Sequence, residues 1–300
     1  ATLRLYGGSI DNFVTDNVLK LIGEHAQNLT CLSVEACDRI TNLGIAKLAE
    51  CKQLQKIDLT GLHKIDDSPI IELVQNLNLS HLQLAETRVT SASLNAIASR
   101  NVPDLLKELD ISWCDEMEDS EGLDNVVQTC TSLDRLMLRE CCHFSTPLDL
   151  LAANCHNITE LSVASNMAVI SDESVFLLSK SLPLLEKIDL GWNTSLTNQS
   201  IQALLSNCRR LTTAILEGLK ITSAPFLQII TVPDELKKFL TEAVNKKILA
   251  HKVSLNDFII KLSELPCLPH RSMMYCTELQ NLSLNYCDFV EDGDLQEIVT

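Results

Sequence analysis

The chain has 300 residues and a formal net charge of −16, and its residues are 46% hydrophobic but only 4% aromatic. The negative charge argues against a nucleic-acid backbone or an anionic membrane as the main partner, because both attract positive surfaces. No apolar stretch of about 18 residues is present that would span a membrane. The sequence also lacks the Walker, G-x-G-x-x-G, H-E-x-x-H and G-x-S-x-G motifs. We therefore expect no enzymatic activity, no catalytic residues, no cofactor and no bound metal.

A pattern L-x-x-L-x-L recurs from the first residues onward. A partial copy ends at Leu3 and Leu5, and Leu29, Leu32 and Val34 form the first complete copy. Further copies begin at residues 54, 79, 106, 133, 158, 185, 211 and 279. The L-x-L alternation is typical of a short strand with one apolar face. Repeat positions are counted below as residues after the first leucine of each copy.

Each predicted strand is followed by a turn and then by apolar residues at helical spacing, such as Ile201, Leu204 and Leu205. A hydroxyl or carboxylate side chain suited to cap a helix N-terminus stands in this turn at Thr41, Asp66, Thr90, Ser171, Thr197 and Thr222. The helix would cover the back of its strand. One such unit cannot bury its apolar face alone, so we expect neighbouring units to stack.

The repeat spacing breaks between Leu211 and Leu279. We expect repeats over 1–231, a helical insert or a degenerate repeat over 232–275, and a terminal repeat over 276–300. An insert would project from one face and serve binding, but this stretch could also join segments separated by residues absent from the sequence. Cys267 and His270 in a C-x-x-H arrangement resemble half a zinc knuckle, which is too few ligands for a tetrahedral site.

Nine of the twelve cysteines fall in two repeat slots. Position 8 holds Cys37, Cys114, Cys141 and Cys287, and the slot three residues before each copy holds Cys51, Cys130, Cys155, Cys208 and Cys276. Such regular placement indicates small buried side chains rather than metal ligands or disulfides. Many unpaired thiols fit a reducing compartment, so we expect a cytoplasmic or nuclear protein.

Two segments carry a family resemblance: Cys51-x-x-Leu54-x-x-Ile57-Asp58-Leu59, and Leu29-x-x-Leu32-x-Val34 followed by Cys37 and Gly44. They resemble the cysteine-containing leucine-rich repeats of F-box/LRR proteins and of antagonist-of-mitotic-exit proteins. The resemblance covers nearly all of the chain except about 232–275. It implies an α/β leucine-rich repeat solenoid of about ten repeats, with a curved parallel β-sheet inside and helices outside.

The resemblance also implies a function. Members of the F-box group are substrate receptors of cullin-type (SCF-like) ubiquitin ligases. No F-box segment with an L-P-x-E-type opening precedes the repeats, and the chain reads as an interior piece of a longer protein. We therefore expect a ligase adaptor to be bound through a region outside this chain. The alternative is a structural scaffold subunit of a large cytoskeletal or axonemal assembly.

The concave face of such a solenoid is the candidate site for a protein partner. Strand residues at positions 2, 4, 6 and 7 would line it, and Trp113, Trp192 and Tyr286 share position 7. An exposed Trp is a common interface anchor, although these rings could instead pack on neighbouring loops.

Charged residues make up the rest of the candidate site. They are Glu86, Glu140, Arg139, Arg135, Asp110, Asp189 and Lys187. A mixed, acid-leaning surface would select a partner with a basic segment. Alternatively, neighbouring charges pair with one another across the sheet.

Overall fold

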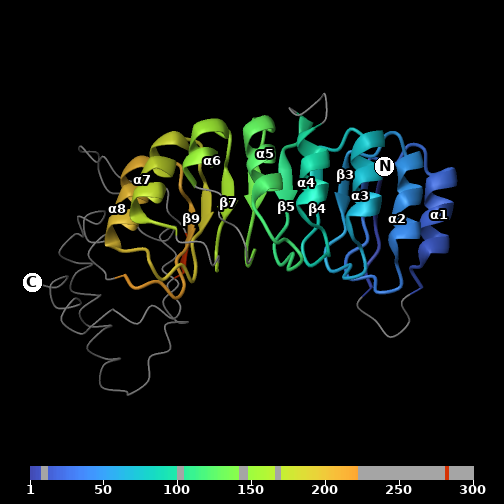
Figure 1. Ribbon diagram of the computed structural model, residues 1–300, viewed down its shortest axis with the longest axis horizontal. Coiled ribbons are helices and arrows are strands. Elements are labelled where there is room, and N and C mark those ends of the chain that lie inside the picture. The colour runs from blue at the N-terminus through green and yellow to red at the C-terminus, as the bar shows by residue number, and fades with distance from the viewer. Residues whose placement is uncertain (8–12, 100–104, 142–147, 166–169, 222–280, 284–300) are drawn as a thin grey trace, which may run out of the picture. The chain divides into compact units, whose positions relative to one another are not determined.

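The computed structural model of the chain describes residues 1–7, 13–99, 105–141, 148–165, 170–221 and 281–283. The chain divides into two compact units, Ala1–Ala168 and Val169–Thr300. Both units are built from the same repeat of a short strand, a turn and a helix (Figure 1).

The strands of each unit are parallel and follow one another in chain order. The first unit contains β1 (Thr2–Arg4), β2 (Cys31–Ser33), β3 (Lys56–Asp58), β4 (His81–Gln83), β5 (Glu108–Asp110), β6 (Arg135–Met137) and β7 (Glu160–Ser162). The second unit contains β8 (Lys187–Asp189), β9 (Thr213–Ile215) and β10 (Asn281–Ser283). From β2 onward, each strand occupies positions 2 to 4 of its repeat, so the periodicity of the sequence sets the register of the sheet.

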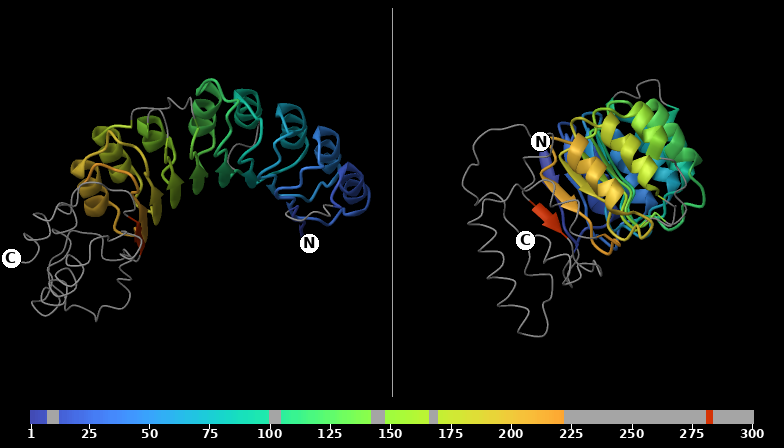
Figure 2. Two further views of the ribbon diagram at one scale, coloured as in Figure 1. Left: turned by 90° about the horizontal axis from the view of Figure 1, so that it is seen from below. Right: turned by 90° about the vertical axis from the view of Figure 1, so that its left-hand side faces the viewer.

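The helices lie on one side of the strands (Figure 2). The first unit has α1 (Asp16–His25), α2 (Asn42–Lys47), α3 (Asp67–Asn76), α4 (Ser91–Ala98), α5 (Glu121–Thr129) and α6 (Leu148–Asn154), with a short 3₁₀ turn η1 (Leu48–Glu50) after α2. The second unit has α7 (Asp172–Ser181) and α8 (Asn198–Asn207). The helical spacing that begins at Ile45 therefore ends in a 3₁₀ turn rather than in one continuous α-helix.

The core lies between strands and helices. The central residue of each strand is buried, as in Leu32, Ile57, Leu82 and Leu109, while its two neighbours face the other side of the sheet. Each buried Leu or Ile side chain stabilises the fold by roughly 1.5–3 kcal/mol. The predicted α/β leucine-rich repeat solenoid is confirmed, and the number of repeats stays a prediction.

The predicted helix caps are also confirmed wherever the structure describes them. The side chains of Thr41, Asp66, Thr90, Ser171 and Thr197 each accept a hydrogen bond from a backbone N–H in the first turn of the helix that follows. Thr222 lies outside the described residues.

Seven of the eight described cysteines occupy the two structural slots that the sequence predicts, and Cys31 lies on β2. At position 8, the thiol of Cys114 donates to the carbonyl of Leu84 at 3.2 Å, and that of Cys141 donates to Ile111 at 3.2 Å. In the other slot, the thiol of Cys155 donates to the carbonyl of Val127 at 3.4 Å. None of the eight cysteines that the structure describes forms a disulfide.

Several expectations fall on residues that the structure does not describe. These are the insert or degenerate repeat over 232–275, most of the terminal repeat over 276–300, and the Cys267, His270 and Cys276 set.

Among the described residues, no group of three His, Cys, Asp or Glu side chains could hold a metal ion. Within the same ranges, no helix has the length and apolar character needed to cross a membrane.

Candidate protein-interaction surface

The side of the sheet opposite the helices, called the open face here, carries a row of polar side chains. In the first unit the strand register places the position-2 residues next to one another in the order Lys56, His81, Glu108, Arg135 and Glu160. Their spacing follows from the parallel pairing, since residues in register on neighbouring parallel strands lie about 5 Å apart. The row alternates in charge over much of its length.

Glu108 is the centre of this row. It is only 7% exposed. It forms an ion pair with Arg135 and accepts a hydrogen bond from Nε2 of Gln83 at 2.6 Å. His81 Nε2 lies 3.8 Å from the Glu108 carboxylate. Arg135 therefore forms an ion pair with a residue of the neighbouring strand, and the cross-strand charge pairing considered from the sequence is present at this position.

His81 lies between Lys56 and Glu108 in the row. Its Nε2 lies 3.1 Å from Nζ of Lys56. Burial lowers the pKa of His81, and the nearby Lys56 ammonium lowers it further, while Glu108 opposes the shift. A lowered pKa favours the neutral imidazole, and a ring nitrogen of a neutral imidazole can accept a hydrogen bond from Lys56.

Three strands have an aspartate at position 4, and its side chain stabilises the turn that follows the strand. Oδ1 of Asp58, Asp110 and Asp189 accepts a hydrogen bond from the backbone N–H two residues later, at 3.0, 2.9 and 3.0 Å. Asp189 is only 7% exposed. Burial raises the pKa of Asp110, and hydrogen bonds from Ser112 partly offset this. Asp110 and Asp189 thus have a structural role that the sequence analysis did not anticipate.

Position 7 lies in a tight turn and not on the strand, so the expectation that it belongs to the strand is wrong. Every described residue at this position from the second repeat onward has a positive φ, and the values are 54° for Ala36, 76° for Gly61, 60° for Glu86, 62° for Trp113, 55° for Glu140, 54° for Ser165, 62° for Trp192 and 66° for Gly218. A left-handed conformation costs a non-glycine residue about 1–2 kcal/mol.

The strained turns are held by hydrogen bonds between repeats. The backbone N–H of Glu86 donates to the carbonyl of Ser112 at 2.9 Å, and that of Trp113 donates to Arg139 at 2.8 Å. The position-7 residues of one unit therefore stand in a row along the edge of its sheet. We call this row the turn ridge; in the first unit it includes Ala36, Gly61, Glu86, Trp113, Glu140 and Ser165.

Both tryptophans lie on such ridges and are nearly half exposed. Trp113 is 46% exposed and belongs to the first unit, while Trp192 is 45% exposed and belongs to the second. The ring of Trp192 lies against the next turn, because a Cβ added to Gly218 would come within 2.6 Å of it. Packing on a neighbouring loop thus accounts for part of the Trp192 surface. Tyr286 lies outside the described residues.

The remaining candidate residues divide between the two units. The first unit contains Glu86, which is exposed on the turn ridge, and Arg139 and Glu140, which are half-buried in consecutive turn positions. Lys187 is exposed on β8 of the second unit. The structure therefore places Trp113, Glu86, Glu140 and Arg139 along one edge of the first unit.

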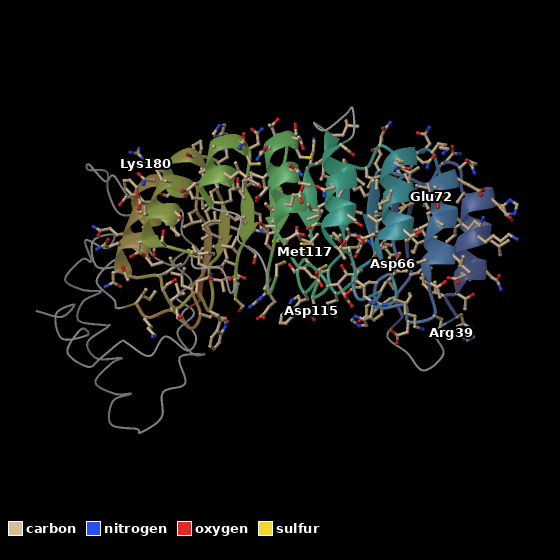
Figure 3. The ribbon with its side chains drawn as sticks, viewed as in Figure 1. Arg39, Asp66, Glu72, Asp115, Met117 and Lys180 are labelled. Carbon is tan, nitrogen blue, oxygen red and sulfur yellow. The ribbon has the colours of Figure 1, made fainter. Side chains whose placement is uncertain are left out.

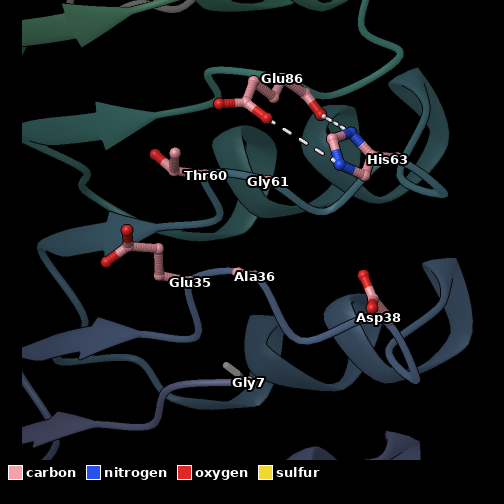
Figure 4. A pocket seen from close by; sticks show the side chains of 8 residues that line it. All are labelled: Gly7, Glu35, Ala36, Asp38, Thr60, Gly61, His63 and Glu86. Atoms are coloured by element: carbon pink, nitrogen blue, oxygen red, sulfur yellow. Dashed lines mark hydrogen bonds and ion pairs between the residues drawn. The ribbon is translucent and has the colours of Figure 1, made fainter. Parts of the chain in front are cut away.

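Two hollows lie beside the turn ridge of the first unit, and the sequence analysis missed both. The first, of about 410 Å³, is lined by Gly7, Glu35, Ala36, Asp38, Thr60, Gly61, His63 and Glu86 (Figure 4). The second, of about 480 Å³, is lined by His63, Glu86, Thr87, Arg88, Trp113, Asp115 and Glu116. His63 and Glu86 line both hollows. The sequence feature that could have indicated the first hollow is the small residue at position 7 of three successive repeats, namely Gly7, Ala36 and Gly61.

Comparison with known proteins finds related sequences and similar solved structures. No model of a known protein family matches the chain. F-box/LRR-repeat protein 4 of Bos taurus is 27% identical over 196 residues, which span 64% of this chain and 29% of that protein.

Among solved structures, one similar chain comes from the complex of Rad7 and Elc1 in yeast, with a TM-score of 0.43 and 17% identity, covering 78% of this chain and 81% of that one. Another comes from the TLR13–ssRNA13 complex, with a TM-score of 0.45 and 14% identity, covering 74% of this chain and 30% of that one.

Proposed function

We propose that this leucine-rich repeat chain is a protein-binding module, and that it recognises substrates for a cullin-type ubiquitin ligase. The single observation that supports binding most directly is the exposed indole of Trp113 on the turn ridge of the first unit, beside a hollow. An aromatic ring at the margin of a pocket is the kind of group that anchors protein interfaces.

The backbone at position 7 does not explain a tryptophan there. Each turn of the ridge requires a positive φ, and Ala36, Gly61 and Ser165 meet that requirement with small side chains. A Trp in the same conformation places a large apolar surface in water, which does not favour the folded state. A partner that covers Trp113 would bury the exposed part of the ring.

The open face supplies the polar part of the proposed interface. Arg135 and Gln83 both bond to the carboxylate of Glu108, so these three side chains present a rigid surface to a partner. A rigid surface loses little conformational entropy on binding. Beside the open face of the first unit, Glu86 is exposed on the turn ridge and adds negative charge to the surface that a partner would meet.

The ligase assignment is supported by the similarity to an F-box/LRR-repeat protein over 196 residues. That match spans only 29% of the relative, so the adaptor contact would be made by a region outside this chain. A binding module needs no catalytic group, which agrees with the sequence expectation that this chain is not an enzyme.

Affinity capture of the full-length native protein from cells, followed by mass spectrometry, tests this proposal. We expect a cullin and its adaptor to be recovered together with candidate substrates. A stable, stoichiometric set of cytoskeletal or axonemal proteins without a cullin would contradict the ligase role and favour the scaffold.

A further inference from the structure

We propose that the two hollows beside the turn ridge of the first unit form one docking groove for an arginine-bearing segment of the protein partner. This inference rests on the proposed protein-binding function and specifies where the partner binds and which side chains it must carry. The groove runs from Gly7 past the shared His63 and Glu86 to Trp113.

Small residues in successive turns line the first hollow. Gly7, Ala36 and Gly61 stand in equivalent positions of three consecutive repeats and are stacked in Figure 4. A Cβ on Gly7 would lie 2.0 Å from the carbonyl oxygen of Ala36, so the close approach of these turns requires glycine there. Larger side chains resume at Glu86 and Trp113, which border the second hollow.

Carboxylates are the most numerous charged groups in the lining of both hollows. The first contains Glu35, Asp38 and Glu86, and the second adds Asp115 and Glu116. Among the residues that the structure describes, the side-chain carboxylates of Glu35 and Asp38 have no hydrogen-bond or ion-pair partner. A positively charged side chain entering the groove would therefore meet two carboxylates that have no ion-pair partner among the described residues.

The basic groups near the groove are already engaged. Nε of Arg88 lies 3.1 Å from Oε1 of Glu116, and Nζ of Lys64 donates to the backbone carbonyl of Asp38 at 2.8 Å. Nδ1 of His63 lies 2.9 Å from the carbonyl oxygen of Glu86, and its Nε2 lies 3.9 Å from the carboxylate of the same residue (Figure 4). The balance of charge in the groove thus stays negative.

Arginine fits this lining better than lysine does. A guanidinium is planar and binds a carboxylate through two parallel hydrogen bonds, whereas an ammonium acts as a point charge. A guanidinium also stacks on an indole face, and Trp113 borders the second hollow. The same negative lining repels phosphates, so a nucleic acid is not the expected occupant.

Binding of a short fluorescein-labelled peptide of alternating glycine and arginine to the full chain tests the groove. We expect the fluorescence anisotropy titration to show saturable binding, and replacement of arginine by uncharged citrulline to abolish it. The charge-reversal double variant Glu35→Lys with Asp38→Lys should weaken binding by about tenfold or more. Trp113→Ala should weaken it through loss of stacking.

A matched control separates the groove from the overall negative charge. Glu50→Lys with Glu72→Lys makes the same change in net charge on exposed residues of η1 and α3. Figure 3 places Glu72 among the helices and Asp115 at the margin of the turns. Equal weakening by the two double variants, or tight binding of the citrulline peptide, would overturn the groove. Circular dichroism confirms that each variant is folded.

The same variants distinguish a failure of the arginine groove from a failure of the proposed protein-binding function. If a captured protein partner is lost with Trp113→Ala but retained by Glu35→Lys with Asp38→Lys, then protein binding holds and the arginine groove is wrong. If no partner depends on any residue of the turn ridge or open face, the proposed function itself fails.

Discussion

The carboxylate of Asp67, the first residue of α3, accepts hydrogen bonds from both the backbone N–H and the hydroxyl of Thr90, the N-cap of α4 in the next repeat, at 2.8 and 2.7 Å. Asp16 bonds Thr41 in the same way at 2.8 and 2.6 Å, and Asp172 bonds Thr197 at 2.9 and 2.5 Å. Each of these aspartates therefore connects the N-termini of two successive helices.

Removal of this connection should destabilise the first unit. Asp67→Ala leaves the backbone N–H of Thr90 and the hydroxyls of Thr90 and Ser93 without their carboxylate acceptor, so we expect a loss of about 1–2 kcal/mol in the free energy of unfolding. Urea denaturation followed by circular dichroism measures it. Glu72→Ala, an exposed change on the same helix, should stay within about 0.5 kcal/mol; equal effects would contradict the role of Asp67.

The same aspartates predict acid sensitivity. Burial tends to raise the pKa of Asp67 and Asp172, but hydrogen bonds from Ser93 and Thr90 in one case, and from Thr197 and Ser200 in the other, lower it below the usual 3.8. Their contribution is therefore complete above the unfolded-state pKa and is lost as pH falls through the lower folded-state pKa. Urea midpoints between about pH 2 and pH 7 should fall less steeply on the acid side for Asp67→Ala than for the wild type. Parallel curves would refute this.

The buried thiols should be inert in the folded protein. Burial raises the pKa of Cys114 to about 11 and that of Cys155 to about 12, and only the thiolate reacts with iodoacetamide. Cys31, which is half-buried on the open face, should be alkylated before Cys114 and Cys155 at neutral pH, as read by peptide mass spectrometry. In urea the difference should vanish. If Cys114 is alkylated as fast as Cys31 in the native protein, its thiol is accessible to the reagent and the prediction is wrong.

The two faces of a strand should respond differently to a new charge. Leu136 is buried at the centre of β6, whereas Met137 beside it faces the open side. Leu136→Asp buries an unpaired carboxylate and should destabilise the first unit by about 3 kcal/mol or more, and Met137→Asp should be much milder. Thermal unfolding compares them. Similar losses would mean that the register of β6 is wrong.

The repeat itself could be predicted from the sequence because strand alternation and helix caps are local signals. Leu32 at the centre of a strand, Thr90 as an N-cap and Cys114 as a buried thiol all follow from spacing within one repeat. The phase of the repeat was sufficient to place the strands, since their pairing register is fixed once one face must be buried.

Features that depend on two adjacent repeats could not be predicted. The Asp67–Thr90 bond, the positive φ at Trp113 and the packing of Trp192 on Gly218 arise only when neighbouring turns are stacked. Asp110 illustrates the difficulty, because its spacing suggested an exposed charge and its turn hydrogen bond is visible only in three dimensions. The hollows beside Gly61 belong to the same class.

The affinity of a captured partner for Trp113→Ala, measured by calorimetry, tests protein recognition by the turn ridge most directly. Phe176→Ala is the matched control, because Phe176 is an aromatic residue on α7 with a similar exposure of 43%. We predict that Trp113→Ala weakens binding by about tenfold or more while Phe176→Ala leaves it unchanged. Unchanged affinity for Trp113→Ala in a folded protein would contradict recognition through this ridge.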